Sequence, residues 1–236
     1  MGKQEKIVSM FNNIAPTYDR ANRVMSMGID KSWRDKACNK TFELYNQKEI
    51  EKIVDVACGT GDMILFWKQN ANKKGVTLKN IVGVDPSVGM MEVGKKKLPE
   101  VEFLEAFATQ MPIENESVDI LSISYGIRNV VERQEAFIEF ARVLKKGGLV
   151  VISEFTKNKK ETPVDYLTDF YINRILPVVG GVISKNKEAY RYLPDSIDEF
   201  LTTENLQKEL KNAGLEPIYT KAFSMKISTL IIAKKI

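Results

Sequence analysis

From about residue 50 onward, short apolar runs alternate with segments that have the hydrophobic spacing of helices. The runs that read as strands cover residues 53–57, 81–84, 101–107, 118–125 and 149–155. Helices are predicted from residue 62, over 87–98 and over 132–144, and the last of them is expected to end at the Lys-Lys-Gly-Gly stretch 145–148. Near-continuous apolar strands separated by helices are typical of a mostly parallel sheet with helices on both faces. The alternation therefore predicts an α/β fold.

The chain is long enough for one large domain, and no repeat, low-complexity tract or linker divides it. We expect a single domain with a helical cover over 1–49, a core over 50–155, an insertion over 156–195, and a closing helix and strand pair over 196–236. Stretches 12–34 and 156–195 are rich in aromatic residues and fall outside the alternation. They either cover the sheet edge or form a lid and a substrate wall beyond the strand ends.

Composition excludes several classes of function. The chain has no histidine, which removes the Ser-His-Asp triad and most zinc enzymes, and its two cysteines cannot form a four-ligand metal site, so no metal is expected. No run approaches the roughly 20 apolar residues of a membrane helix. A net charge of +4 is weak for a nucleic-acid-binding domain. The polar start, residues 1–6, lacks the apolar core of a secretory signal, so we expect a cytoplasmic protein.

Polar residues follow the first two predicted strands, at the edge where parallel sheets bind ligands. The first strand leads into the segment Asp55-Val56-Ala57-Cys58-Gly59-Thr60-Gly61-Asp62, and the second ends in Asp85. The glycines let the backbone approach a ligand closely. The third glycine of a dinucleotide fingerprint would fall at Ile64, and Asp62 would repel a pyrophosphate. A nicotinamide dehydrogenase is therefore disfavoured.

An acidic residue at position 62 suits a ligand with a positive charge, such as the amino group or sulfonium of S-adenosylmethionine. Asp85 lies where a carboxylate can accept hydrogen bonds from both ribose hydroxyls of that ligand. The purely structural alternatives are that Asp62 caps its helix and that Asp85 begins a turn. We favour the ligand site, with S-adenosylmethionine as the cofactor.

These residues resemble the class I S-adenosylmethionine-dependent methyltransferases, whose fold is Rossmann-like. Four further segments narrow the resemblance to the UbiE/MenG family: residues 11–19 (FNNIAPTYD), 25–29 (MSMGI), 124–130 (SYGIRNV) and 190–193 (YRYL). The family C-methylates demethylmenaquinol and 2-polyprenyl-6-methoxy-benzoquinol. The resemblance runs from about residue 7 to the C-terminus, and it implies a prenylated quinol as the substrate.

The resemblance also implies which residues bind the cofactor. The family's contacts fall on Thr60, Asp85 and Ser124, and its adenine-side pair falls on Phe107 and Ala108. The family often has Asn or Asp where this chain has Phe107, so stacking on Phe107 and the Ala108 N–H would replace a side-chain hydrogen bond. The full expected set is Asp55, Gly59, Thr60, Gly61, Asp62, Asp85, Phe107, Ala108 and Ser124.

The chemistry of a quinol calls for a cation beside the ring. A quinone carbon is electrophilic, whereas an ionised quinol carries negative charge on the ring carbon and can attack a methyl sulfonium. A phenolic pKa near 10 leaves only about 0.1% ionised at pH 7, and a fixed cation favours the ionised form. We expect Arg128 to supply that cation, with Asn129 orienting it or a water. Water, Tyr18 or Asp19 would accept the proton, with Glu154 as a weaker alternative.

Two other functions stay open, an RNA methyltransferase and a non-catalytic cofactor-binding partner of quinone enzymes. Against the first, the fourth strand is not followed by the Asn/Asp-Pro-Pro-aromatic motif of amine methylation, and neither cysteine follows a proline. The apolar segment 170–179, beside Lys185 and Lys187, predicts peripheral contact with the inner face of a membrane. Burial of this segment in the fold or in a homodimer is the alternative.

Overall fold

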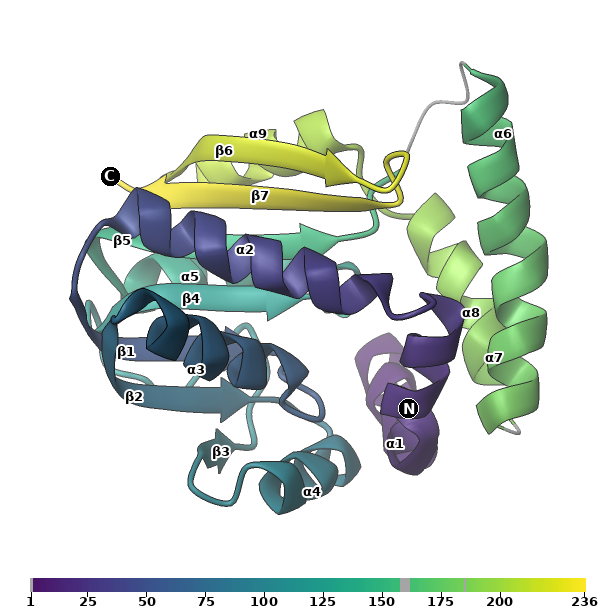
Figure 1. Cartoon of the computed structure of the whole chain (residues 1–236), viewed down its shortest axis with the longest axis horizontal. Coiled ribbons are helices and arrows are strands. Elements are labelled where there is room, and N and C mark those ends of the chain that lie inside the picture. Colours follow the sequence, from purple (N-terminus) through teal and green to yellow (C-terminus); the bar gives the residue numbers. More distant parts are fainter. Residues whose placement is uncertain (1, 158–161, 185) are drawn as a thin grey trace.

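The computed structural model describes residues 2–157, 162–184 and 186–236. In these residues the centre is a seven-stranded sheet in the order β3-β2-β1-β4-β5-β7-β6 (Figure 1). Its strands are β1 (Glu49–Val56), β2 (Thr77–Val84), β3 (Glu102–Leu104), β4 (Val118–Ser124), β5 (Leu144–Glu154), β6 (Leu215–Phe223) and β7 (Ser228–Lys235). Strands β1 to β5 pair in parallel, whereas β7 is antiparallel to both β5 and β6. The predicted α/β fold is confirmed.

Helices cover both faces of this sheet (Figure 1). The covering helices are α2 (Ile29–Tyr45) and α3 (Asp62–Lys74) on one face, and α5 (Arg133–Val143) and α9 (Thr203–Asn212) on the other. Successive strand residues point to opposite faces, so Ile53 packs with Trp67 of α3 while Val54 packs with Phe137 of α5. This two-sided burial explains why the strands are apolar almost throughout.

Most of the remaining helices gather beyond the carboxyl ends of the parallel strands, where α1 (Lys3–Met25), α6 (Pro163–Phe170), α7 (Leu176–Ser184) and α8 (Lys187–Asp198) lie on the right of Figure 1. Helix α4 (Val88–Lys97) lies lower, next to β3. Two short helical turns complete the set, η1 (Ile127–Asn129) and η2 (Tyr171–Ile175). Ile14 and Met25 of α1 share an apolar cluster with Leu176 of α7 and Tyr190 of α8. The aromatic-rich stretches at 12–34 and 156–195 therefore pack partly on each other, above the strand ends.

Several element boundaries differ from the sequence prediction. The third strand is only Glu102–Leu104, and residues 145–148, predicted to end a helix, lie inside β5. Gly147 has a positive φ of 81°, and the β4–β5 register shifts between Val118 and Ile120, so this glycine serves an irregularity in the strand rather than a helix end. The predicted start of α4 is confirmed, because the Ser87 hydroxyl accepts a hydrogen bond from the Met90 N–H at 3.4 Å.

Helix α8 crosses the expected boundary at residue 195 and ends at Asp198. The helix that follows, α9, begins after Thr202, whose hydroxyl accepts a hydrogen bond from the Asn205 N–H. The expected strand pair after it is confirmed as β6 and β7. Across the described residues, no helix combines the length and the apolar composition needed to cross a membrane.

Candidate active site at the strand ends

A cavity of about 530 Å³ opens beyond the carboxyl ends of β1, β2 and β4, within the usual range for small-molecule sites. All of the expected cofactor residues except Gly61 line it: Asp55, Gly59, Thr60, Asp62, Asp85, Phe107, Ala108 and Ser124. Gly61 has a different task. It has a φ of 78° at the start of α3, and an added Cβ would lie 3.0 Å from the Leu98 side chain. The structure thus places the rest of the predicted set around one space.

Asp85 is held in place by backbone N–H groups from two neighbouring turns. Its Oδ2 accepts a hydrogen bond from Gly59 N at 2.8 Å, and its Oδ1 accepts one from Ser87 N at 2.7 Å. Burial raises the pKa of Asp85 to about 6, and these two hydrogen bonds act against that rise. Because each carboxylate oxygen has a second lone-pair site, Asp85 retains the capacity to accept two hydroxyl donors from a ligand.

Asp55 and Ser124 form the floor of the cavity. The Ser122 hydroxyl donates to Asp55 Oδ1 at 2.6 Å, and burial raises the pKa of Asp55 to about 7. The hydroxyl of Ser124 is buried and has no hydrogen-bond partner among the described residues. Buried polar groups are nearly always paired, so this hydroxyl fits a polar group of a bound ligand.

The side of the cavity formed by the turn after β3 is suited to a flat, apolar group. The Phe107 side chain lines it and is 46% exposed, whereas Ala108 beside it is buried. An exposed ring at a cavity wall can stack on a heteroaromatic base, as expected in place of a polar side chain.

The backbone at Gly126 packs closely against Ala57 in the cavity lining. A Cβ added at Gly126 would lie 2.6 Å from the Ala57 side chain, so only glycine fits at this position.

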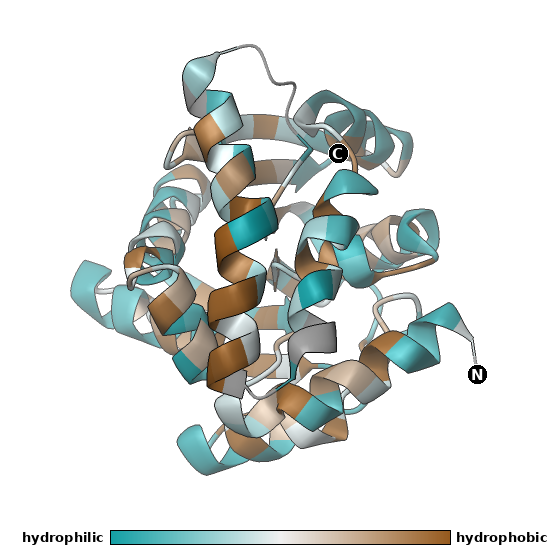
Figure 2. Cartoon of the chain, turned by 90° about the vertical axis from the view of Figure 1, so that its right-hand side faces the viewer, coloured by the Kyte–Doolittle hydropathy of each residue, from teal (hydrophilic) through white to brown (hydrophobic). Residues whose placement is uncertain are grey.

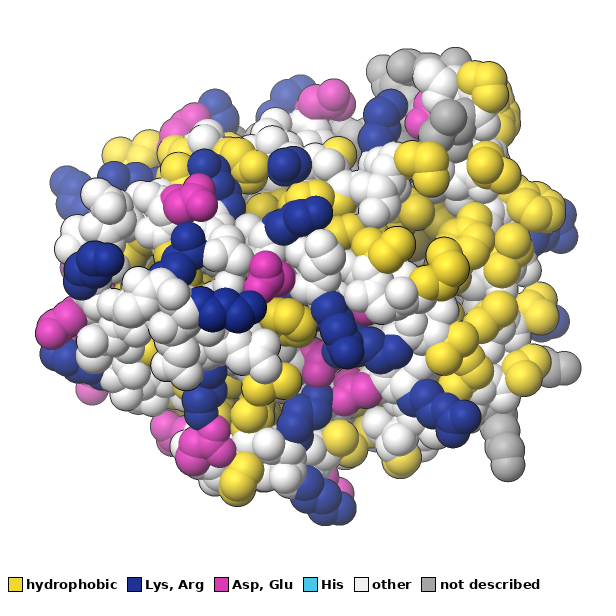
Figure 3. All heavy atoms as spheres, in the orientation of Figure 1, with side chains coloured by type: hydrophobic (Ala, Val, Ile, Leu, Met, Phe, Trp, Pro, Cys, Tyr) yellow, Lys and Arg dark blue, Asp and Glu magenta, His cyan; other side chains and the backbone are white. Residues whose placement is uncertain are grey.

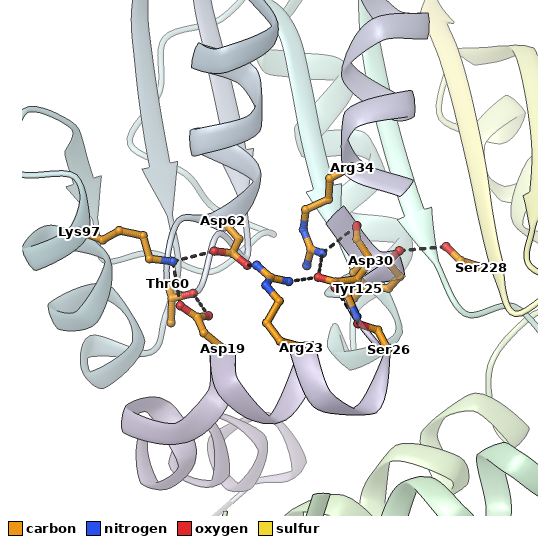
Figure 4. Close-up of polar contacts among 11 residues, drawn as sticks. Asp19, Arg23, Ser26, Asp30, Arg34, Thr60, Asp62, Lys97, Tyr125 and Ser228 are labelled. Carbon is orange, nitrogen blue, oxygen red and sulfur yellow. Dashed lines mark hydrogen bonds and ion pairs between the residues drawn. The ribbon is translucent and has the colours of Figure 1, made fainter. Parts of the chain in front are cut away.

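The Asp62 carboxylate, which was expected to face a cationic ligand, already forms ion pairs within the protein. Asp62 forms an ion pair with Arg23 of α1, and its Oδ1 accepts a hydrogen bond from Lys97 Nζ at 2.6 Å (Figure 4). Burial opposes ionisation of Asp62, but Lys97, Arg34 and Arg23 outweigh it and hold its pKa below the ordinary value. Asp62 lines the cavity as an ionised but compensated carboxylate, and it does not cap α3 with its side chain.

Asp19 ties α1 to the glycine turn rather than facing a ligand. It accepts a hydrogen bond from the Thr60 hydroxyl at 2.6 Å and one from Lys97 Nζ at 2.8 Å (Figure 4). It lines neither the large cavity nor the smaller one described next. The expectation that Asp19 accepts the substrate proton is therefore not favoured by its position, because the side chain is committed to this contact.

A second cavity of about 150 Å³, here called the aromatic chamber, lies between α1, α2 and the helices after β5. Arg128 lines it, and the Arg128 charge is matched by Glu154, since Nη1 donates to Glu154 Oε1 at 2.6 Å. The same Nη1 donates to the Tyr125 carbonyl at 2.8 Å, and Nε donates to the Ser196 hydroxyl at 3.2 Å. Arg128 is thus rigidly oriented, and Glu154 is fully buried outside both cavities.

Asn129 and Tyr18 lie between the two spaces. Asn129 lines the large cavity and accepts a hydrogen bond from the Tyr192 hydroxyl at 3.1 Å. Tyr18 lines both cavities, and burial raises its pKa above the ordinary value. Tyr18 therefore stays protonated at neutral pH and is better suited to donate a hydrogen bond than to accept a proton.

Three residues without a predicted role also line both cavities, Phe11, Arg34 and Tyr125. Arg34 Nη1 donates to Asp30 Oδ2 at 2.6 Å, and its guanidinium carbon lies 5.2 Å from the centre of the Tyr125 ring. Tyr125 directly follows β4 and has a positive φ of 60°. The position of Tyr125 directly after a strand could have predicted that it lines the site. Arg34 lies within a helix, and nothing in the sequence around it indicates a place in the site.

Among the described residues, no group of three or more His, Cys, Asp or Glu side chains is placed to hold a metal ion. The orphaned Ser124 hydroxyl, the ring of Phe107 and the two accepting oxygens of Asp85 instead fit a nucleoside with a polar tail. The chemistry of this donor and acceptor set matches the adenine, ribose and amino acid parts of S-adenosylmethionine.

Comparison with known proteins finds relatives over the whole chain. The chain is 57% identical over 236 residues to the ubiquinone/menaquinone biosynthesis C-methyltransferase UbiE of Campylobacter jejuni, covering 100% of both chains. It is 35% identical to the demethylmenaquinone methyltransferase of Chlorobaculum tepidum, covering 98% of this chain and 93% of that one. A crystal structure of an S-adenosylmethionine-dependent methyltransferase from Aquifex aeolicus shares the fold, with a TM-score of 0.59, 16% identity, and coverage of 84% and 89%.

The family description "ubiE/COQ5 methyltransferase family" matches residues 1–235. This match and the relatives above confirm the resemblance drawn from the four sequence segments. The chain belongs to the ubiE/COQ5 methyltransferase family.

Proposed function

We propose that this chain transfers a methyl group from S-adenosylmethionine to a ring carbon of a reduced, prenylated quinone. The observation that carries the proposal is the contact between two unlike cavities. The cavity of about 530 Å³, here called the polar cavity because Asp55, Asp62 and Asp85 line it, meets the aromatic chamber. Four residues line both: Phe11, Tyr18, Arg34 and Tyr125. A methyl donor and an aromatic acceptor bound in these spaces would meet at that junction.

The polar cavity offers a contact for each part of S-adenosylmethionine. Asp85 would accept the ribose hydroxyls, Phe107 would stack on adenine, and Ser124 would bond the amino acid end. When bound, S-adenosylmethionine supplies an electrophilic methyl group on a sulfonium. Because Asp62 is compensated by Arg23 and Lys97, we assign it to holding α1 over the turn rather than to neutralising the sulfonium.

On the substrate side, the protein's residues orient the ring. Arg128 presents a guanidinium fixed by Glu154, and it acts on a ring oxygen chiefly as an oriented donor because its charge is matched. Asn129, held by the Tyr192 hydroxyl, faces the cofactor side. Tyr18 remains protonated and Asp19 is committed to Lys97, so we assign the proton from the quinol hydroxyl to water.

An anaerobic turnover assay tests this function. Purified protein with S-adenosylmethionine should methylate a short-chain demethylnaphthoquinol or methoxy-benzoquinol when dithionite is present, and mass spectrometry should find one added methyl on carbon. The oxidised quinone should not react, because its ring carbons are electrophilic. Equal rates with and without reductant would contradict the mechanism. Cofactor binding by calorimetry without any turnover would instead favour a non-catalytic binding partner, and transfer to RNA would favour the other rival.

We also propose that the protein contacts a membrane peripherally, because its substrate carries a prenyl chain. Side chains of α6 and α7 are apolar and exposed: Leu167 63%, Phe170 55%, Val178 65% and Val182 70%. Hydrophobic side chains gather over this part of the surface, and apolar residues recur along the same helices in a second view (Figures 2 and 3). The exposed Arg174 would meet anionic headgroups. Of the two lysines expected beside the segment, Lys185 lies outside the described residues.

Part of the predicted apolar segment faces inward instead. Leu176 is buried and the Tyr171 hydroxyl donates to the Met25 carbonyl at 2.6 Å, so the same helices wall the aromatic chamber. Flotation with anionic liposomes at low salt should carry the protein upward, and Val178→Asp with Val182→Asp should abolish this. Ile138→Asp on α5, equally exposed at 63%, is the control. No flotation, with a dimer that the Asp variants dissociate, would assign the face to a second copy.

A further inference from the structure

The aromatic chamber has a size and lining that point to one planar ring. Its volume is about 150 Å³, and a dry apolar cavity of about that volume accommodates a benzene molecule. Eight aromatic residues line it: Phe11, Tyr18, Trp33, Tyr125, Phe155, Tyr171, Tyr190 and Tyr192. Aromatic walls favour an aromatic ligand through stacked and edge-to-face contacts. A fused second ring or a prenyl chain would have to extend out of the chamber.

Two polar atoms of chamber residues are buried without a partner. Arg34 Nε and the Tyr190 hydroxyl find no hydrogen-bond acceptor or donor among the described residues. Arg34 engages Asp30 through Nη1, at 2.6 Å from Oδ2 and 3.3 Å from the carbonyl, which leaves Nε free. Since buried polar groups are nearly always paired, two orphaned atoms on residues that line one aromatic space indicate a ligand with two polar atoms.

The charge states of the two groups define what they can bind. Arg34 is permanently cationic and only donates hydrogen bonds. Burial raises the pKa of Tyr190 above its ordinary value of about 10. Its hydroxyl is therefore protonated at neutral pH and can donate a hydrogen bond as well. Two donors, one of them cationic, suit a ring that carries two oxygens, one of which becomes negative.

We propose that the aromatic chamber binds the dihydroxylated ring of the substrate, with Arg34 Nε–H donating to the oxygen that ionises and the Tyr190 hydroxyl donating to the other. This assignment rests on the proposed methyl transfer and goes beyond it, because it names the ring's binding site and its two donors. Arg34 lines both cavities, so a ring oxygen at Arg34 would lie beside the reacting carbon. Arg128, which also lines the chamber and is fixed there by Glu154, remains a further oriented donor to the ring.

The sharpest test uses Tyr190→Phe, because it removes one orphaned hydroxyl and leaves the ring. The matched control is Tyr219→Phe on β6, which is partly exposed and lines neither cavity. Binding of 1,4-dihydroxynaphthalene, kept reduced with dithionite, and of 1-naphthol would be measured by calorimetry with S-adenosylhomocysteine present. Thermal unfolding of each variant would be followed in parallel.

For Tyr190→Phe we expect binding of the diol to weaken by about tenfold, the effect of one lost hydrogen bond, while 1-naphthol binds as to the wild type. The melting temperature should stay unchanged or rise by about 2–4 °C, because an unsatisfied buried hydroxyl is removed. A purely structural hydroxyl would show the reverse pattern, a lower melting temperature with unchanged preference for the diol, and that result would overturn the proposal.

Arg34 is tested separately, because its removal also breaks its ion pair with Asp30. Arg34→Lys keeps the charge but has no Nε–H fork, so we expect kcat for the diol to fall about 10²-fold with a smaller change in KM. Raising the pH should recover part of that loss, because solvent then ionises the ring. A folded Arg34→Lys protein with unchanged kcat and pH profile would overturn the assignment. Methyl transfer by the wild type with no effect of either variant would refute this inference alone, whereas no transfer at all would refute the proposed function.

Discussion

The polar cavity and the aromatic chamber share lining residues of α1, yet they are built differently. In the polar cavity, Asp85 is held by backbone N–H groups of Gly59 and Ser87, at the ends of paired parallel strands. In the chamber, most of the side chains come from α1, α2, η2, α7 and α8, which pack largely through apolar contacts. A site fixed by a sheet should tolerate changes in remote side chains, whereas a site assembled from helices depends on each packing partner.

The largest expected effect concerns the buried ion pair that fixes the chamber wall. Arg128→Met leaves Glu154 buried without its cation, and such a change typically costs about 3–5 kcal/mol of folding free energy. Urea denaturation would measure this. We also expect kcat for the quinol to fall roughly 10²–10³-fold, as for loss of other oriented donors.

A second substitution separates the loss of stability from the loss of kcat. Arg128→Met combined with Glu154→Gln should recover much of the stability but not kcat. Arg133→Met, which breaks the partly exposed pair with Glu209, is the control and should leave turnover intact. Normal kcat in the folded double variant would reduce Arg128 to a structural residue and would weaken the contrast between the two sites.

The next effect tests whether the polar cavity depends on one side chain. Asp85→Ala removes a carboxylate that accepts from two backbone N–H groups and, in our proposal, from two ribose hydroxyls. Loss of hydrogen bonds to a charged group should cost about 2–4 kcal/mol of cofactor binding, more than tenfold in Kd by calorimetry.

The control for Asp85 is Asp119, whose carboxylate accepts from Glu51 N and Lys52 N at the opposite end of the sheet. Asp119→Ala should lower stability while cofactor affinity stays unchanged. Unchanged binding by the Asp85 variant would show that the ribose lies elsewhere in the cavity.

A smaller effect is expected where α1 joins the two sites. Asp19→Asn weakens the contacts with Lys97 and Thr60, which hold α1 on the glycine turn. These partly exposed contacts should contribute about 1 kcal/mol, so hydrogen exchange in α1 should speed up roughly fivefold. Lys68→Gln, which breaks an exposed pair with Glu100, should change nothing in α1. Equal exchange in both variants would mean that α1 is held by apolar packing alone.

The smallest effect is a pH dependence of the polar cavity. Because burial raises the pKa of Asp85 to about 6, cofactor affinity should fall about twofold between pH 7 and pH 6 and more steeply below that. Asp85→Asn should lose this dependence in calorimetric titrations. In the free protein the sign is opposite, since raised pKa values at Asp85 and at Asp55, to about 7, make the folded state bind more protons. Their contribution to stability should therefore decrease as pH rises from about 4 to about 7.

The strand alternation was enough to predict the order of strands and helices along the chain, because burial of a parallel sheet on both faces demands apolar strands. It was also enough to bring Asp55, Asp85 and Ser124 together, since the carboxyl ends of neighbouring parallel strands lie at one edge. Boundaries were less secure. The glycines after α5 were predicted to end a helix but lie inside β5, in an irregular stretch that the pairing of β4 with β5 skips between Leu144 and Leu149.

The sequence by itself determined the fold, the edge of the sheet where the polar cavity lies, and the family, because these depend on local spacing and on a few short segments. Only the tertiary structure decided which charges are compensated and which polar atoms are left without partners. Asp62 meets Arg23 and Lys97, and Arg128 meets Glu154, across long stretches of chain. Whether a carboxylate is free or paired depends on atoms within a few ångströms that come from distant helices, so no local pattern could reveal it.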